Sequence, residues 1–409
     1  MEEWRKYKLK DFIEFNPKEK VPQGKLCRKI SMDQITPFTR FVESNIYEVY
    51  KGGAKFRNYD TIMARITPCL ENGKTAYISS LHSEEVAVGS TEYIVLRKRE
   101  NISDSKFIFY LAISPIVRDI AIKSMVGSSG RQRVQQDVLE NYEIPIPSLP
   151  MQKNIAHILS VLDDKIELNK RINDNLEQQA QALFKSWFVD FEPFKEGMFV
   201  DSELGMIPES WRVCSAETIF KINIGKTPPR KEQQWFSNIN NGNVKWISIS
   251  DLGSNEIFIE DSKEYLTKEA ISKFNIIVVP EDTILVSFKL TVGRVGISNC
   301  ELTTNEAVAR FYLPKSYFRE YTYLSLKKYN YARLGSTSSI ATAVNSKIIK
   351  NMKLLIPPVT IISEFSKRIN PLFNAIRIYE NEIRNLSKIR NTLLPKLMSG
   401  ELKINDINN

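Results

Sequence analysis

The sequence predicts an α+β fold in which two similar, β-rich mixed globular domains are separated by two long, antiparallel, coiled-coil-like helices with an internal pseudo-twofold repeat. Three observations carry this prediction. Short sequence patterns recur in the same order in both halves of the chain, heptad spacing appears at two equivalent places, and short β-branched segments precede it each time. With 409 residues, the chain is long enough to give each half its own hydrophobic core.

Five short patterns occur twice along the chain. They are Trp4-Arg5 and Trp211-Arg212, KISMDQI (29–35) and WISISDL (246–252), DTIM (60–63) and DTIL (282–285), GSS (127–129) and GST (335–337), and NYEIPIP (141–147) and NMKLLIP (351–357). The offset between copies stays between about 207 and about 222 residues, which indicates a tandem duplication of one globular unit and one helix. The predicted boundaries are 1–150 for the first globular domain, 151–196 for the first helical region, 197–356 for the second globular domain and 357–409 for the second helical region.

Within the globular regions, the β-strand prediction rests on short β-branched stretches such as TEYIVLRKR, TILVSF and EAVARFYLP, each bounded by Gly, Pro or Asn. The stretch 106–125 has a helical pattern that Pro115 interrupts or restarts, because proline is tolerated at the first turn of a helix and not inside it.

The two helical regions have apolar residues at alternating three- and four-residue spacing. The residues expected to pack are Ile155, Leu162, Ile172, Leu176, Leu183 and Trp187 in the first helix, and Ile369, Ile376, Ile383, Leu386 and Leu393 in the second. Arg390 interrupts the second series, and the first contains polar residues that include Asn169. Two such helices in one chain are expected to pack on each other, although two separate oligomerisation helices are the alternative. At roughly 35–40 residues, each helix would span about 50–60 Å and act as a spacer.

Composition favours a polyanionic partner and gives little support for catalysis. The formal net charge is +9, which suits nucleic acid. Four cysteines without a C-x-x-C pair and two histidines predict no metal site. No nucleotide-binding glycine motif and no methyltransferase motif is present, so no catalytic residue and no cofactor is expected in this chain. Neither a signal peptide nor a membrane span is recognisable, which predicts a cytoplasmic protein.

Several longer stretches resemble a known family. They are IPIPSLPMQKNIAHILSVLDDKIELNKRIN (144–173), ALFKSWFVDFEPF (182–194), LGMIPESW (204–211), IGKTPPRK (224–231) followed by VKWISISDL (244–252), and LLPKLMSGEL (393–402). Together they resemble the DNA specificity subunit of type I restriction-modification systems over essentially the whole chain. The resemblance implies two target recognition domains, each reading one half of a bipartite, asymmetric site in double-stranded DNA, with conserved helical regions between them.

The resemblance also implies partners. Two DNA methyltransferase (modification) subunits would methylate adenine at N6 with S-adenosylmethionine, and restriction/translocase subunits would use ATP and Mg²⁺ to cleave unmodified DNA. The target adenine would be flipped out of the duplex by the methyltransferase subunits. Two other hypotheses stay open at this point: a self-contained DNA-modifying enzyme, either a nuclease or a methyltransferase, and a scaffold protein whose coiled coil is the functional part.

Candidate DNA-binding residues follow from the chemistry of recognition, since phosphates favour Lys, Arg and backbone N–H groups and bases favour Arg, Lys, Asn, Gln, Ser and Thr. In the first domain the candidates are Lys55, Arg57, Arg65, Lys74, Ser128, Ser129, Arg131, Gln132 and Arg133. In the second they are Lys226, Thr227, Arg230, Lys289, Arg294, Ser336, Thr337 and Ser338. The glycines beside the two Ser-rich segments allow a backbone to approach DNA closely.

Overall fold

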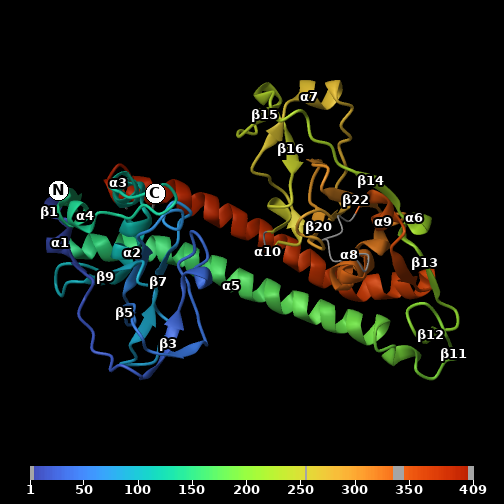
Figure 1. Ribbon diagram of the computed structural model, residues 1–409, viewed down its shortest axis with the longest axis horizontal. Helices are drawn as coiled ribbons and strands as arrows, with labels where there is room; N and C mark the ends of the chain where they lie inside the picture. The colour runs from blue at the N-terminus through green and yellow to red at the C-terminus, as the bar shows by residue number, and fades with distance from the viewer. Residues whose placement is uncertain (1–3, 254–255, 335–344, 404–409) are drawn as a thin grey trace. The chain divides into compact units, whose positions relative to one another are not determined.

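The computed structural model describes residues 4–253, 256–334 and 345–403, and its secondary structure is the α+β mixture that the sequence predicts (Figure 1). Residue contacts divide the chain into two compact units. Unit 1 consists of the residues up to Asn169 together with those from Glu382 onward, and unit 2 consists of Lys170–Asn381. Each unit therefore contains one segment of each long helix.

Unit 1 is built on two four-stranded sheets in its described part. The strands are β1 (Arg5–Lys8), β2 (Ile13–Phe15), β3 (Leu26–Ile30), β4 (Tyr47–Val49), β5 (Ala54–Phe56), β6 (Thr61–Ala64), β7 (Thr75–Tyr77), β8 (Ala87–Gly89), β9 (Tyr93–Lys98) and β10 (Glu143–Ile146), and the shorter helices are α1 (Leu9–Phe12), α2 (Ser105–Ile113), α3 (Pro115–Lys123) and α4 (Gln136–Asn141). One sheet has the antiparallel order β2-β9-β6-β7. The other has the order β4-β3-β8-β5, in which β3 and β8 are parallel, and β1 pairs with β10.

Unit 2 is built on a five-stranded and a four-stranded sheet in its described part. The strands are β11 (Phe199–Val200), β12 (Ile207–Pro208), β13 (Arg212–Ser215), β14 (Lys221–Ile224), β15 (Phe236–Ser237), β16 (Val244–Ile247), β17 (Phe258–Ile259), β18 (Tyr265–Leu266), β19 (Ile284–Ser287), β20 (Val295–Ser298), β21 (Thr303–Thr304), β22 (Val308–Tyr312) and β23 (Lys353–Ile356), and the shorter helices are α6 (Ala216–Ile219), α7 (Lys268–Lys273), α8 (Arg319–Lys328) and α9 (Ser346–Lys350). The sheets have the orders β14-β22-β19-β20-β17 and β15-β18-β16-β21, and β13 pairs with β23.

The predicted internal repeat is confirmed, because the repeated patterns fall on equivalent elements. DTIM and DTIL begin at the turns into β6 and β19, which hold the same place between their neighbours in the two main sheets. KISMDQI and WISISDL begin on the last two residues of β3 and β16, each of which pairs in parallel with a later strand. NYEIPIP and NMKLLIP form β10 and β23, which pair with β1 and β13, the strands that begin at Arg5 and Arg212 of the first repeated pattern. The GST copy lies outside the described residues.

The two long helices are α5 (Leu149–Phe188) and α10 (Val359–Ser399). In unit 1 their segments run antiparallel, since Arg390 Nη1 donates to Asp163 Oδ1 at 2.7 Å and Asn169 Nδ2 donates to Glu382 Oε2 at 2.8 Å. Residue number therefore rises along one segment as it falls along the other. The polar residues Arg390 and Asn169, which interrupt the heptad spacing, are partners in these two contacts.

In unit 2 the helix segments meet through an aromatic cluster. The Phe188 ring lies 4.7 Å from Phe365 of α10, 5.7 Å from Trp211 and 4.8 Å from Tyr321 of α8, measured between ring centroids. Trp187 lies 5.7 Å from Phe365. The aromatic residues at the end of α5 thus join both long helices to the globular part of the same unit.

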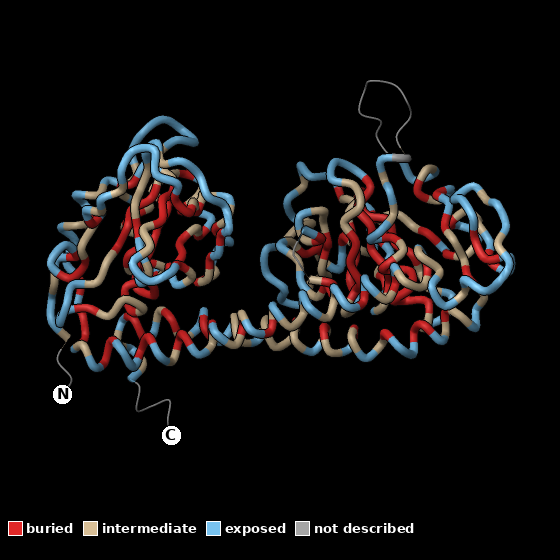
Figure 2. Tube along the Cα trace, turned by 90° about the horizontal axis from the view of Figure 1, so that it is seen from below, coloured by how far each residue is buried: buried red, intermediate tan, exposed pale blue. Residues whose placement is uncertain are grey.

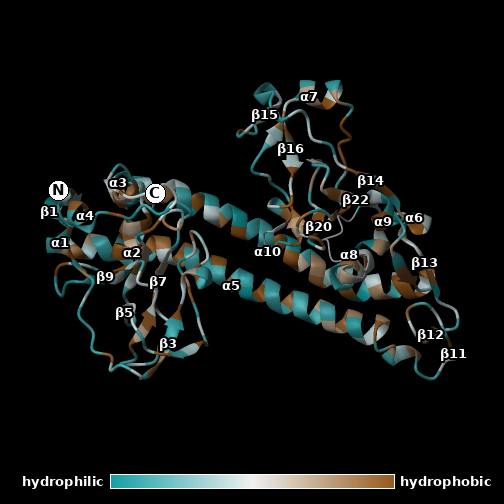
Figure 3. Ribbon diagram, viewed as in Figure 1, coloured by the Kyte–Doolittle hydropathy of each residue, from teal (hydrophilic) through white to brown (hydrophobic). Residues whose placement is uncertain are grey.

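Along the helices, buried residues alternate with exposed ones within each unit (Figure 2), and hydrophobic residues alternate with hydrophilic ones (Figure 3). Of the residues expected to pack, Ile155, Ile369 and Ile376 are buried, while Leu162, Ile172, Leu176, Leu183, Trp187, Ile383, Leu386 and Leu393 are half-buried. Residues outside that series are buried as deeply, and Phe373 of α10 packs at 6.3 Å from Phe258 of β17. The expected seam between two helices is therefore incomplete, because each segment also buries a face against its own sheet and α8 or α2.

The break predicted at Pro115 is confirmed, since α2 ends at Ile113 and Pro115 is the first residue of α3. No helix in the described ranges combines the length and the apolar character that crossing a membrane requires.

Candidate nucleic-acid interface

In unit 1, four chain segments meet at one end of the sheet β2-β9-β6-β7. Because neighbouring strands run antiparallel, the ends of β2 and β6 lie beside the starts of β9 and β7. The residues at these positions are Asn16 after β2, Arg65 after β6, Lys74 before β7 and Glu92 before β9. The strand order thus gathers charged residues from distant parts of the sequence.

A groove of about 670 Å³ lies beside these residues. Its cationic lining residues are Lys18, Lys20, Lys55 and Arg65. Lys18 and Lys20 are exposed, and Lys55 Nζ donates to the backbone carbonyl of Glu19 at 3.0 Å. Glu19 also lines the groove, and its carboxylate forms ion pairs with Arg97 and Arg57 at 2.6 and 3.1 Å. The lining carries net positive charge, which suits phosphate oxygens.

The Gly-Ser loop, residues 126–133, is attached to the same end of the sheet. Arg133 forms a β-bridge with Ile66, and the Gln132 backbone N–H donates to the Thr67 hydroxyl at 3.0 Å. Gly127 has φ +131°, a conformation that L side chains rarely adopt. The residues Ser128, Ser129 and Arg131 at the tip are exposed. The loop therefore presents polar side chains from a fixed base.

Glu92 joins the loop to the sheet. Arg133 donates to both carboxylate oxygens of Glu92 at 2.7–3.0 Å, and Arg65 Nε donates to Oε2 at 3.1 Å. The hydrogen bond from Arg133, with that from Arg65, lowers the pKa of Glu92 against the opposing effect of burial. A carboxylate that stays ionised holds two guanidinium groups from different segments in one fixed arrangement.

Unit 2 has the same arrangement at the corresponding end of its main sheet. In the order β14-β22-β19-β20, the ends of β14 and β19 lie beside the starts of β22 and β20. The residues found there are Lys226 and Thr227 after β14, Lys289 after β19, Arg294 before β20 and Glu306 before β22. The Thr227 hydroxyl donates to the Glu306 carboxylate. As in unit 1, an acidic residue thus orients a candidate DNA-binding residue.

Arg230 lies on the segment that follows β14. Its guanidinium donates two hydrogen bonds to the Glu264 carboxylate at 2.8 and 2.9 Å and lies 4.5 Å from the ring centroids of Phe236 and Trp246. The hydrogen bond from Arg230 lowers the pKa of Glu264. Half of the Arg230 side chain remains exposed to solvent. The guanidinium group of Arg230 is therefore held in one orientation and is still accessible to DNA.

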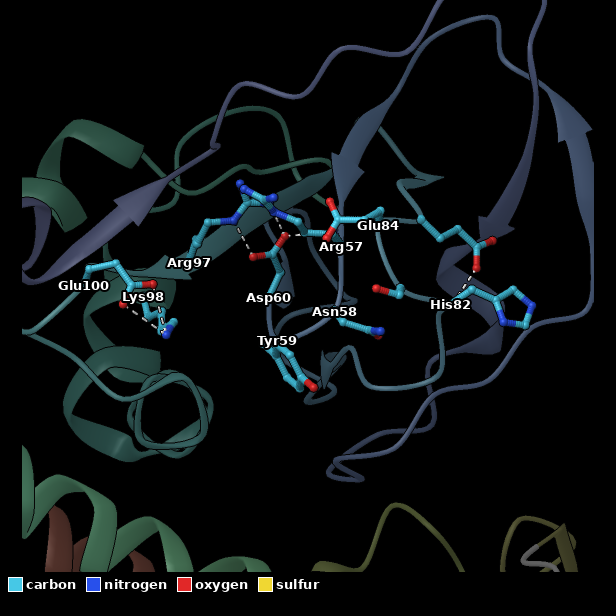
Figure 4. Close-up of a pocket in the computed structure, with 11 residues that line it drawn as sticks. Arg57, Asn58, Tyr59, Asp60, His82, Glu84, Arg97, Lys98 and Glu100 are labelled. Carbon is cyan, nitrogen blue, oxygen red and sulfur yellow. Dashed lines mark hydrogen bonds and ion pairs between the residues drawn. The ribbon is translucent and has the colours of Figure 1, made fainter.

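The structure places some of the candidate residues elsewhere. Arg57 lines a separate pocket of about 500 Å³ with Tyr59, Asp60, His82 and Arg97, at the opposite end of β6 (Figure 4). Lys74 Nζ donates to the Met32 carbonyl at 2.6 Å, and Arg294 Nη1 donates to the Ile249 carbonyl at 2.8 Å. Lys55 and Lys226 also donate to backbone carbonyls of their own units, so such a contact does not by itself remove a side chain from the interface. The candidates Ser336, Thr337 and Ser338 lie outside the described residues.

Two features of the interface were missed in the sequence. Lys18 and Lys20 lie on the segment that follows β2, as Lys226 and Arg230 lie on the segment that follows β14, so comparing the equivalent segments of the repeat would have pointed to them. Glu92 and Glu306 are negatively charged, so a search for cationic and polar DNA-binding residues does not select them. Their role depends on the register of β9 and β22, for which the sequence contained no signal.

Comparisons with known proteins agree with this architecture. A family model described as the type I restriction modification DNA specificity domain matches residues 1–178 and 208–388, the two copies of the repeat. The type I restriction enzyme MjaIX specificity subunit of Methanocaldococcus jannaschii is 31% identical over 313 residues, which cover 74% of this chain and 70% of that relative. The HindI specificity subunit of Haemophilus influenzae is 26% identical over 405 residues, covering 84% and 86%.

A solved structure supports the fold. The S subunit of a type I restriction-modification system from M. genitalium aligns with a TM-score of 0.56 at 15% sequence identity, over 97% of this chain and 96% of that one. At this identity the likeness concerns the fold, and the relationship rests on the sequence matches.

Proposed function

This chain belongs to the type I restriction-modification DNA specificity family, and from that premise we propose that each unit binds one half of a bipartite, asymmetric DNA site through the end of its main sheet. The chain is the sequence-specific DNA-recognition subunit, distinct from the catalytic subunits, and a self-contained nuclease or methyltransferase is not favoured. The observation that carries the proposal is the gathering of cationic and hydroxyl side chains at equivalent sheet ends in two duplicated units.

The proposal extends to partners. Two modification subunits would supply adenine-N6 methylation with S-adenosylmethionine, and restriction/translocase subunits would supply ATP- and Mg²⁺-dependent cleavage. The uninterrupted helices α5 and α10, with 40 and 41 residues, would set the number of unread base pairs between the half-sites. No catalytic step would involve a residue of this chain.

The test is a map of N6-methyladenine in DNA from cells with and without the gene. Loss of methylation at one gapped, two-part, asymmetric motif would support the proposal and reveal both half-sites. Unchanged methylation in cells that express the chain and its modification subunits would contradict it.

Exchanging Glu92 for Gln is expected to loosen discrimination and strengthen non-specific binding. The change removes the charge that orients Arg65 and Arg133, so preference for the half-site bound by unit 1 should fall about tenfold, the order of one bidentate contact. It also makes the net charge more positive by one unit. Affinity for unrelated DNA should therefore be higher, and it should decrease more steeply as the salt concentration increases. Dissociation constants of the assembled complex for site and unrelated duplexes across a salt series measure both effects.

The matched control for this variant is Glu100→Gln. It makes the same change of charge after β9, at the opposite end of the same sheet, where Glu100 is exposed and pairs with Lys98 at 3.0 Å. We expect little change in discrimination from the control. Equal changes in the two variants would show that Glu92 acts through charge alone and does not position the arginines.

A further inference from the structure

Leu290 has two properties that are unfavourable for a surface residue. Its side chain is 99% exposed, although the described core of unit 2 offers extensive apolar surface. Its backbone has φ +59°, in the left-handed region where a branched, non-glycine residue is strained. Folding gains nothing from either property, and backbone strain of this kind clusters at functional sites, so Leu290 is a candidate for a contact outside the chain.

The loop that carries Leu290, residues 288–294 between β19 and β20, is held firmly at its base. The Ser287 hydroxyl donates to the Thr291 carbonyl at 2.6 Å and accepts from the Arg294 backbone N–H at 2.9 Å. The Gly293 N–H donates to the Ser287 carbonyl at 2.9 Å, and a Cβ at Gly293 would stand 2.7 Å from the Tyr331 ring. One hydroxyl thus joins both sides of the loop, so Leu290 is presented from a braced tip.

The tip belongs to the sheet end already described. The Phe288 N–H donates to the Ala307 carbonyl at 2.9 Å, next to Glu306, whose carboxylate accepts from the Thr227 hydroxyl. Lys289, beside Leu290, is exposed and can approach a phosphate. The apolar side chain is therefore flanked by groups that suit a nucleic-acid backbone.

We propose that Leu290 makes an apolar contact with the bases of the half-site bound by unit 2, an inference that rests on the proposed function. An apolar side chain gains nothing from phosphates. In a DNA groove it gains from the 5-methyl group of thymine or from a base step that it partly separates. Both contacts remove the exposed leucine from water, and both need a rigid tip that projects beyond its polar neighbours.

The test uses the full chain in its assembled complex and duplexes that carry the methylated motif. We expect Leu290→Ala to weaken binding of that motif about tenfold, the order of burying one leucine side chain, and Leu290→Met to stay within about threefold of the original. Leu290→Lys separates this inference from electrostatics, since added positive charge alone would strengthen binding to a polyanion, whereas loss of a base contact weakens discrimination. Leu204→Ala, at an exposed turn between β11 and β12, is the control and should bind normally.

Two further measurements distinguish the sources of the contact. Replacing thymine by deoxyuracil in this half-site should abolish the difference between the original protein and Leu290→Ala if the methyl group is touched. A rise in 2-aminopurine fluorescence at one step, absent in the Ala variant, would instead identify a separated base step. The effect of folding is checked by Leu290→Gly, which relieves the backbone strain and should melt no lower than the original while binding weakly.

Equal binding by the original protein and by the Ala, Gly and Lys variants would overturn the inference. Weaker assembly with the other subunits in the absence of DNA would also overturn it, because Leu290 would then meet a protein. If the original protein itself shows no motif-specific binding, the proposed function fails before this inference is reached.

Discussion

A matched insertion of seven residues, after Asn169 in α5 and before Ile383 in α10, is expected to lengthen the unread spacer of the site by about three base pairs. Seven residues add about 10 Å to a helix and preserve the heptad spacing, and each base pair adds about 3.4 Å. The contact between Asn169 and Glu382 shows that these positions face each other within unit 1. Three base pairs also turn the duplex by about 100°, so methylation should become less efficient as the spacer shifts.

The methylation map of cells that carry the insertion measures this shift directly. A seven-residue insertion in α5 alone is the control. It lengthens α5 but not α10 between the helix segments of unit 1 and those of unit 2. The interhelical contacts of both units, such as Asp163–Arg390 and Phe188–Phe365, then cannot be kept together with continuous helices, and methylation should be abolished. A matched insertion that leaves the spacer unchanged would show that the helices do not set it.

Replacing Arg390 by Leu is expected to cost about 3–5 kcal/mol of stability in unit 1, the usual effect of leaving a buried charge without its partner. Arg390 is 7% exposed and Asp163 is 3% exposed. Asp163 Oδ2 also accepts from the Tyr110 hydroxyl at 2.7 Å, and Arg40 Nη1 donates to that hydroxyl at 3.2 Å. The substitution would leave Asp163 with one neutral donor in a buried position.

The double variant Asp163→Leu/Arg390→Leu should recover much of this loss, since a buried pair exchanged for apolar residues is often neutral. Denaturant unfolding of both single variants and the double variant gives the coupling energy, and hydrogen exchange locates the change in unit 1. Lys388→Leu, at an exposed position of α10, is the control and should stay within about 0.5 kcal/mol of the original. An Arg390→Leu protein of unchanged stability would contradict the prediction.

Arg390 illustrates what sequence can and cannot provide. Its position in the heptad series identified it as an interruption, yet its partner Asp163, which also accepts from Tyr110, lies far away in the chain and could not be assigned from spacing. The repeat predicted the duplicated α+β architecture because local patterns such as DTIM and DTIL specify the same strands. Helix burial was predicted incompletely, because spacing does not distinguish a face on another helix from a face on a sheet.

The interface residues likewise differ in how far the sequence could predict them. The segment that carries Lys18 and Lys20 could be found by comparison with the equivalent segment after β14, whereas the ion pairs of Glu92 depend on three segments meeting in one register. Arg57 has the right chemistry for DNA contact but lines another pocket, because it lies on the segment that leads into the start of β6, whereas the groove lies near the end of that strand. Whether such a residue faces the proposed interface depends on the strand topology, which cannot be read from the residue type.

The discontinuity of unit 1 has a consequence for synthesis on the ribosome. Residues 170–381 form unit 2 as one continuous stretch, so it can fold once it has emerged. Unit 1 needs Leu394, Leu397 and Met398 of α10 to complete the core that contains Ile155 and Leu159 of α5. At about 5–20 residues per second, the first half of that core waits roughly 10–50 s for its last helix. During translation, the first unit to begin is therefore the last to close, and chaperones have an apolar α5 surface to protect in that interval.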